Sequence, residues 1–265
     1  MKKLFAIFAV LALTAVSRPL LAGVVMTQEI VTNSGSNTST DNRTVMVQGN
    51  KQKVVMHGQT IVLDLDKGKM LVLDSGAKTY TELPFPPQGP MASMMQNMGG
   101  VNLDFKKTGG SQTLSGYKCE EYDSTGKSMM AEFSAKGCFS SDAPGAAQYV
   151  AFTELLAKKF AAAGMAKTTG NPDGVPLVLE TTTKFTNFNI PGMPPEQAEK
   201  LKAMMANRPP TTSKSTTTSI KTEDLPAGTF EIPAGYTERK IAMGAGGGMG
   251  GARAPMAGPT PYEGE

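Results

Sequence analysis

The chain has 265 residues, of which 40% are hydrophobic, 6% aromatic and 18% charged, and tryptophan is absent. A formal net charge of +3 gives no basic patch of the kind that neutralises nucleic-acid phosphates. Beyond the N-terminal region no apolar stretch reaches the roughly 18 residues that a membrane-spanning helix needs. We therefore expect no nucleic-acid partner and no transmembrane segment in the mature chain.

The first 22 residues have the pattern of a secretory signal peptide. Lys2 and Lys3 form a basic region, the apolar run Leu4–Val16 follows, and small residues come next. Cleavage after Ser17 or after Ala22 fits the pattern, and Ala22 is preferred. No cysteine lies nearby, so no lipid anchor is expected. Its removal leaves 23 basic and 23 acidic residues, which predicts a nearly neutral exported protein, periplasmic or, as a second choice, secreted.

Residues 23–83 alternate between apolar and polar positions, and turn signals recur every 8 to 10 residues. This pattern predicts an antiparallel meander. The expected strands after the first are 44–48, 51–56, 60–66, 69–74 and 78–83. In the strand at 60–66 the apolar side chains share one face, and Asp64 and Asp66 lie on the other. We expect the first face to be buried and the second to be solvated.

Prolines and then methionines interrupt this pattern between residues 84 and 100. Met91, Met94, Met95 and Met98 have the spacing of one helix face, which begins after a proline and ends at glycine. Clustered thioethers can bind Cu(I), so copper handling is one alternative. The preferred interpretation is an amphipathic helix on the sheet. Its flexible methionines also suit a surface that accepts variable apolar ligands.

Strands resume at residue 101 and alternate with two further helices. The expected strands are 101–107, 111–115, 117–122, 127–135, 177–188 and 211–222, with a turn at Ser124–Gly126. Helices are expected at 146–163 and from Pro194. Their apolar stripes contain Phe152, Leu156, Phe160, Leu201 and Met205.

The pattern from Phe230 to Tyr236 ends the folded part. From about residue 243 the chain consists mostly of Gly, Ala, Pro and Met without an apolar pattern, which is typical of a disordered tail. The predicted organisation is a signal peptide at 1–22, a single domain at 23–242 and a tail at 243–265.

Only two cysteines are present, Cys119 and Cys138. In an oxidising compartment such a pair usually forms a disulfide. The bridge would close a loop of about 20 residues and stabilise the fold by about 3 kcal/mol. A metal site built from both cysteines and His57 is the alternative, and the structural disulfide is preferred.

Residue patterns of known catalytic sites are missing. The single histidine, His57, excludes HExxH and other multi-histidine sites, and no G-x-S-x-G motif occurs. A Ser–His pair using His57 is conceivable, but a solvated turn histidine is the preferred interpretation. Asp64 and Asp66 could in principle bind a cation, but a solvated strand face is the preferred interpretation. The glycines of 246–251 match G-x-G-x-x-G without the required strand and helix. We expect no enzyme activity, no cofactor and no metal.

Four short motifs stand out along the chain. The first is D-x-D-x-G-K at 64–69 with the Lys78–Glu82 segment, and the second is the G-Y-x-C motif ending at Cys119. The third and fourth are Gly174–Leu177 and Phe230–Tyr236. Together they resemble an exported bacterial family of unknown function, domain-of-unknown-function family 4412. The resemblance covers about residues 23–240, and the family is similar in strand order to the LolA/LolB-like periplasmic lipoprotein carriers.

This resemblance implies a mainly β (α+β) fold: a curved antiparallel sheet, or incomplete barrel, with two or three helices on its concave side. It also implies a non-enzymatic protein that binds a lipid or lipidated ligand there. The alternatives are a copper-handling protein and an envelope structural or stress-response protein without a small ligand. The expected lid over the ligand consists of Met91, Met94, Met95, Met98, Phe152, Leu156, Phe160, Leu201 and Met205.

Overall fold

The computed structural model describes residues 22–89, 92–93, 101–128, 131–186, 194–206 and 208–240. Within these ranges the chain forms 13 strands, the helices α2 (Ala146–Ala162) and α3 (Pro195–Ala206), and the short 3-10 helix η1 (Ala227–Phe230). The predicted mainly β class is confirmed. The expected signal peptide, the residues Met91, Met94, Met95 and Met98, and the expected tail lie outside the described residues.

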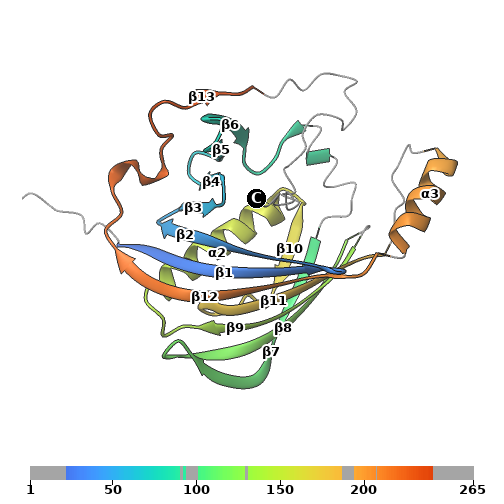
Figure 1. The fold of residues 1–265 in the computed structure, drawn as a ribbon. Helices are drawn as coiled ribbons and strands as arrows, with labels where there is room; N and C mark the ends of the chain where they lie inside the picture. Colours follow the sequence, from blue (N-terminus) through green and yellow to red (C-terminus); the bar gives the residue numbers. More distant parts are fainter. Residues whose placement is uncertain are drawn as a thin grey trace, which may run out of the picture.

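All 13 strands belong to one sheet, in the order β10-β7-β8-β9-β11-β12-β1-β2-β3-β4-β5-β6-β13. Neighbours pair antiparallel except at the two ends, where β10–β7 and β13–β6 are parallel. The sheet is open and strongly curved, and α2 lies in its concavity (Figure 1). The strands are β1 Gly23–Ser34, β2 Asn37–Gln48, β3 Lys51–Met56, β4 Gln59–Asp64, β5 Lys69–Asp74, β6 Thr79–Pro84, β7 Val101–Leu114, β8 Tyr117–Lys127, β9 Ala131–Ser140, β10 Ala166–Thr169, β11 Val175–Phe185, β12 Thr211–Glu223 and β13 Thr237–Glu238.

The first half of β2 is a strand that the sequence pattern does not predict. The expected strand began at residue 44, whereas β2 begins at Asn37 and pairs with β1 along its whole length. Residues 37–43 are polar on both faces, so the period-two signal is missing there. Backbone pairing with β1 supplies the order instead, aided by a hydrogen bond from the Thr38 hydroxyl to Asn33.

The turn expected at Ser124–Gly126 is wrong, because β8 continues through these residues to Lys127. Ser124 pairs with Phe105 of β7 on one side and with Ala135 of β9 on the other. Hydrogen-bonded ladders on both sides outweigh the local turn preference of a Ser-Thr-Gly sequence.

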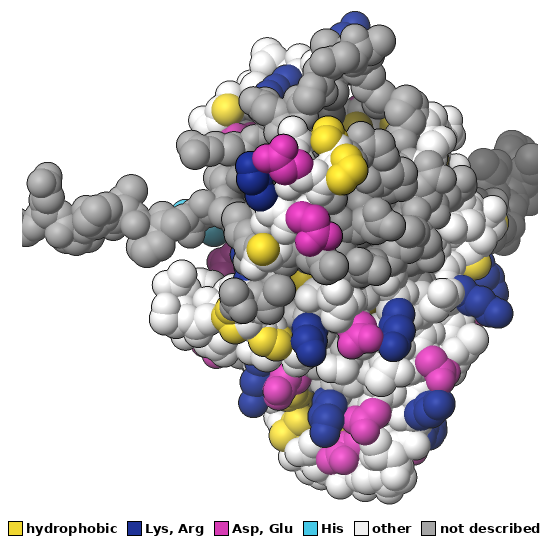
Figure 2. All heavy atoms as spheres, turned by 90° about the vertical axis from the view of Figure 1, so that its right-hand side faces the viewer, with side chains coloured by type: hydrophobic (Ala, Val, Ile, Leu, Met, Phe, Trp, Pro, Cys, Tyr) yellow, Lys and Arg dark blue, Asp and Glu magenta, His cyan; other side chains and the backbone are white. Residues whose placement is uncertain are grey.

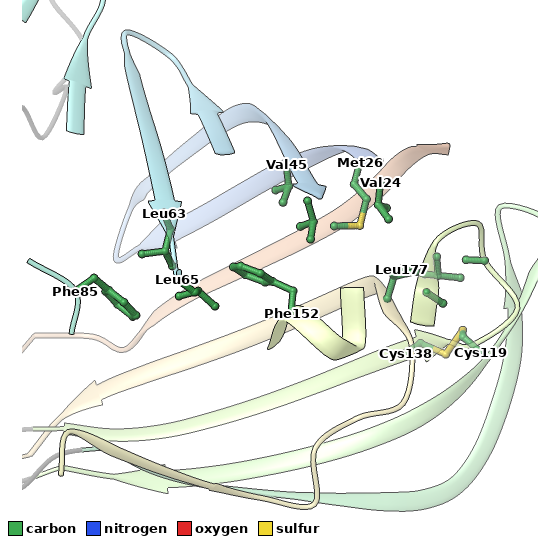
Figure 3. Close-up of a cluster of buried hydrophobic side chains, with 14 residues drawn as sticks. Val24, Met26, Val45, Leu63, Leu65, Phe85, Cys119, Cys138, Phe152 and Leu177 are labelled. Carbon is green, nitrogen blue, oxygen red and sulfur yellow. A yellow bond between two sulfur atoms is a disulfide. The ribbon is translucent and has the colours of Figure 1, made fainter. Parts of the chain in front are cut away.

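Helix α2 fills the concave side of the sheet, as predicted, and forms the centre of the main core. Phe152 is fully buried and lies among Val24, Met26, Leu65 and their neighbours (Figure 3). The start of α2 can lie close to Val24 of β1 because residue 145 is glycine. Its φ of 73° is left-handed, and a Cβ there would lie 2.2 Å from a methyl carbon of Val24.

The face of β4 that was expected to be solvated is buried, which corrects the sequence-based expectation. Val62, Leu71 and Leu73 form a second cluster, on which Phe230, Ile232 and Tyr236 of the C-terminal segment pack. This segment is secured by a hydrogen bond from Lys53 Nζ to the Thr229 carbonyl (3.0 Å) and by β13, which pairs with β6. A contact between residues nearly 170 positions apart therefore decides which face meets solvent.

Removing the ring of Phe230 tests this cover. We expect Phe230→Ala to lower the free energy of unfolding by about 1–3 kcal/mol, less than for a fully buried phenylalanine because Phe230 is only partly buried. Urea denaturation followed by circular dichroism measures the change. A loss below about 0.5 kcal/mol would show that the segment does not contribute to the fold.

Cys119 and Cys138 are both buried and form a disulfide between β8 and β9, as preferred from the sequence. Since their sulfurs are bonded to each other, these cysteines do not form a metal site with His57. A structural disulfide is typical of proteins that fold outside the reducing cytosol. The bond thus favours an exported protein.

Helix α3 is present where a third helix was expected, but it does not lie over α2 and the concave face. It projects beyond the ends of β11 and β12 (Figure 1). The physical reason is its place in the chain, because it connects these two long strands at their tips. The expectation that this helix covers the concavity is therefore corrected.

Candidate functional site

The concave face can be followed residue by residue from β1, whose side chains alternate between the two faces of the sheet. Met26 belongs to the core under α2, so Gln28, Ile30 and Thr32 point to the same side. The register between β1 and β2 is continuous over these positions, with Gln28 opposite Arg43. The concave face therefore runs from the apolar core under α2 toward the far ends of β1 and β2.

Two rows of directly paired residues cross this part of the concave face, and we call them together the distal floor. Directly opposite residues in an antiparallel sheet lie on the same face. The first row contains Lys107, Tyr122, Gly137, Leu179, Ser215, Ile30 and Asp41. The second row contains Phe105, Ser124, Ala135, Thr181, Ser213 and Thr32.

Aromatic rings gather at the β7–β8–β9 end of the distal floor. The rings of Phe105 and Tyr122 contact Phe139 edge to face, with centroid distances of 6.5 and 5.5 Å. The β12–β1 end of the distal floor carries hydroxyl side chains. There the Thr32 hydroxyl donates a hydrogen bond to Ser213 (3.3 Å). The distal floor thus combines apolar surface with a few polar groups, which is the usual lining of small-molecule sites.

Two buried hydroxyls on the distal floor lack a hydrogen-bond partner among the described residues. They are the Oγ atoms of Ser124, which is 4% exposed, and Ser215, which is 7% exposed. A buried polar group left unpaired costs about 1–3 kcal/mol. By strand spacing the two serines are about 15 Å apart along the sheet. A ligand with polar atoms could recover this cost at either position.

A chain of polar side chains begins at the core-side border of the distal floor. Arg43 Nε donates to Gln28 Oε1 (2.8 Å), Gln28 Nε2 donates to Thr217 Oγ1 (3.1 Å), and Thr217 donates to the Pro176 carbonyl (2.6 Å). Gln28 and Thr217 are each 2% exposed. The chain holds the guanidinium of Arg43 in one orientation.

Burial changes the ionisation of this region. Desolvation lowers the pKa of Arg43 from its usual value, and the electrostatic interaction with Tyr149 of α2 offsets part of that change. Desolvation raises the pKa of Tyr149, while Arg43 acts in the opposite direction. Because arginine stays protonated in proteins, Arg43 is a cation on the concave face.

The residues predicted as a ligand lid are placed as follows. Phe152 is core, and Leu156 and Phe160 are partly buried against the same cluster, with Phe160 5.1 Å from Phe85 between ring centroids. Leu201 and Met205 belong to α3, and their side chains are not described. Met91, Met94, Met95 and Met98 lie outside the described residues. A lid role of the four methionines, Phe152, Leu156 and Phe160 stays a prediction, whereas α3, which carries Leu201 and Met205, does not lie over the concave face.

The other residues weighed from the sequence have local roles. His57 is exposed in the β3–β4 turn. Asp64 is 6% exposed and accepts hydrogen bonds from the backbone N–H groups of Asp66 and Lys67, and it lies 3.6 Å from Lys51. Asp66 accepts a hydrogen bond from Asn50. Both aspartates therefore stabilise a turn in this structure.

Two cavities outside the concave core are mixed in character. One of about 420 Å³ lies at the β7–β8–β10 edge and is lined partly by Asp104, Lys127 and Lys167. Another of about 300 Å³ lies between β3–β5 and the C-terminal segment. Basic and acidic side chains also alternate over the lower part of the surface in Figure 2. None of these features concentrates one kind of ligand-binding group.

Within the described ranges no helix has the length and hydrophobicity to span a bilayer. No group of three or more His, Cys, Asp or Glu residues in these ranges could hold a metal ion.

Comparison with known proteins finds one family model that matches part of the chain. Residues 33–156 match the family described as Domain of unknown function (DUF4412). The family resemblance inferred from the sequence motifs is thereby confirmed. No curated protein matches the chain.

Several solved structures are similar in fold at low identity. PNGF-II in space group C2 is 9% identical with a TM-score of 0.38, and the match covers 82% of this chain but only 31% of PNGF-II. A Vibrio parahaemolyticus domain described as an outer membrane lipoprotein-sorting protein is 7% identical, with a TM-score of 0.32 and coverages of 79% and 89%. A DUF1329 family protein from Desulfovibrio piger is 10% identical, with a TM-score of 0.33 and coverages of 80% and 91%. These similarities concern the arrangement of strands alone.

Proposed function

We propose that this protein is a non-enzymatic periplasmic carrier, with a half-barrel of the LolA/LolB type, that binds a lipid or another apolar ligand on the distal floor. The observation that carries the proposal is the pair of buried, unpartnered hydroxyls of Ser124 and Ser215 among aromatic and aliphatic side chains. An acyl chain would contact the apolar groups, and its ester, amide or acid oxygens would pair with the hydroxyls. Each CH₂ removed from water contributes about 0.8 kcal/mol.

Location and lack of catalysis belong to the same proposal. The disulfide supports an oxidising compartment, and the basic and apolar N-terminal pattern supports export to the periplasm. On the distal floor most of the paired residues offer hydroxyls and apolar side chains, and the charged side chains Asp41 and Lys107 pair only at its two ends. Binding without chemistry is the function that such a lining supports best.

Filling the distal floor tests the proposal. Ala135 lies between Ser124 and Thr181 on this floor. We expect Ala135→Trp to weaken palmitate binding at least about 10-fold, because the indole occupies the space of several methylene groups. Isothermal titration calorimetry with delipidated protein and palmitate measures the affinity, and thermal unfolding confirms that the variant is folded.

Ser134→Trp is the matched control. Ser134 precedes Ala135 on β9, is exposed, and points to the opposite face of the sheet. We expect its palmitate affinity to stay within about 3-fold of wild type. Equal losses in both variants, or no palmitate binding by the wild type, would contradict the carrier proposal. Native mass spectrometry of protein from its own periplasm that shows Cu(I) and no lipid would favour the copper-handling alternative.

A further inference from the structure

We infer that Arg43 binds the anionic head group of the acyl-chain ligand, so that the protein selects amphiphiles with a carboxylate or phosphate over neutral ones. This inference rests on the proposed function and adds the chemical class of the ligand. It concerns the border between the core under α2 and the distal floor, where Arg43, Gln28 and Ser215 lie on the concave face.

The guanidinium of Arg43 has donors to spare. It carries five N–H groups, and the bond from Nε to Gln28 uses one of them. No hydrogen bond leads from its terminal nitrogens to another described residue, and none of the ion pairs among the described residues includes Arg43. A planar fork of free donors is the group that recognises carboxylate and phosphate oxygens in pairs.

Orientation by Gln28 separates this arginine from a surface side chain. Gln28 is 2% exposed and its amide is held in turn by Thr217, so the acceptor for Nε does not move with solvent. The chain of three hydrogen bonds contains no negative group. It therefore positions the partly buried guanidinium without neutralising its charge, and removing such a charge from water is costly unless a counter-ion binds.

Ser215 is the second and independent observation. Ser215 lies two residues before Thr217 on β12, on the same face and nearer the distal floor, and it pairs with Ile30 of β1. Its buried hydroxyl has no partner among the described residues. By strand spacing its Cα is about 12 Å from that of Arg43, a distance that the arginine side chain and a bound anion together span. One anionic group can thus accept from the guanidinium and from the hydroxyl.

The position also agrees with an amphiphile. From Arg43 the concave face continues over Ile30 and Leu179 to the aromatic rings of Tyr122 and Phe105. A head group at Arg43 would direct the acyl chain along this apolar path. The cation at one end and the apolar surface beyond it therefore match the charged head group and the acyl chain of a fatty acid or a lysophospholipid.

The test compares three probes of equal chain length: palmitate, 1-palmitoyl lysophosphatidic acid and methyl palmitate. For the wild type we expect at least one anionic probe to bind about 10- to 100-fold more tightly than the methyl ester. Arg43→Gln should remove this preference and leave the methyl ester affinity unchanged. Arg43→Lys keeps the positive charge but lacks the paired donors of the guanidinium, so it should retain part of the preference for anionic probes. Arg239→Gln, an exposed arginine on the C-terminal segment, is the matched control.

The outcomes separate this inference from the proposed function. Equal binding of charged and neutral probes, unaltered by Arg43→Gln, overturns the anion site and leaves the carrier function standing. Absence of binding by all three probes overturns both. A parallel loss for all probes in Arg43→Gln assigns Arg43 a structural role and overturns the site. Should Arg43→Gln fail to fold, Ser215→Ala and Arg43→Lys decide, because each should weaken anionic probes alone.

Discussion

Phe152→Ala is expected to lower the free energy of unfolding by about 3–5 kcal/mol, the range for a fully buried phenylalanine. Phe152 is 0% exposed and packs α2 against Met26 of β1 and Leu65, which follows β4 (Figure 3). The ring cannot be replaced by water, because the surrounding side chains are apolar and offer no hydrogen bonds. Urea denaturation of the exported protein, followed by circular dichroism, gives the difference.

Glu154 provides the control on the same helix. It is exposed, so Glu154→Ala should change the free energy of unfolding by less than about 0.5 kcal/mol. A comparable small effect for Phe152→Ala would mean that α2 is not required for the fold. The helix would then be a removable cover, as the predicted lid role of Phe152 implies, and palmitate affinity would fall more than stability.

Cys138→Ser is expected to lower the free energy of unfolding by about 2–4 kcal/mol. The bond closes a loop with a sequence separation of 19 residues, and both cysteines are at most 2% exposed. Loss of the bond frees the unfolded chain and leaves an unpaired thiol in the core. Non-reducing peptide mapping should first show the Cys119–Cys138 cross-linked peptide in the wild type.

The double variant Cys119→Ser/Cys138→Ser is the companion measurement. Since either single substitution already breaks the bridge, the double variant should be close in stability to Cys138→Ser. Reduced wild-type protein should behave in the same way. Free thiols in the mature protein, or strictly additive losses, would show that the two cysteines act separately.

These stability predictions and the binding predictions address different parts of the molecule. Phe152 and the disulfide lie in the main core, while Ala135 and Ser124 belong to the distal floor. Loss of palmitate binding in a variant with normal unfolding therefore reports on the site. Loss of both reports on the core.

Sequence alone predicted those features that depend on neighbouring residues. The turn glycines, such as Gly49 and Gly58 with φ of 56° and 73°, separate β2, β3 and β4 as expected. The 3.6-residue period placed α2, and the even pair of cysteines predicted their disulfide. The resemblance to the matched family could be inferred from short sequence motifs, without knowledge of the fold.

The candidate site was only partly within reach of the sequence. Arg43 pairs across the strand with Gln28, and Gln28 bonds to Thr217, which is 189 residues further along the chain. The alternation of Met26 and Gln28 could have marked the inward face of β1. This alternation could not reveal that β12 is the neighbour of β1 in the sheet. The hydroxyls of Ser124 and Ser215 carry no local signal, because serine is common on exposed strands.

Local order in this protein was therefore determined by the sequence itself: the turns, the strand periods, the central helix and the cysteine pair. The tertiary structure alone decided which faces are buried. It continued β8 through a predicted turn, covered Val62 and Asp64 with the segment around Phe230, and placed Arg43 at the edge of an apolar floor. The physical reason is that burial is a property of contacts between distant segments, while turn and period preferences act within a few residues.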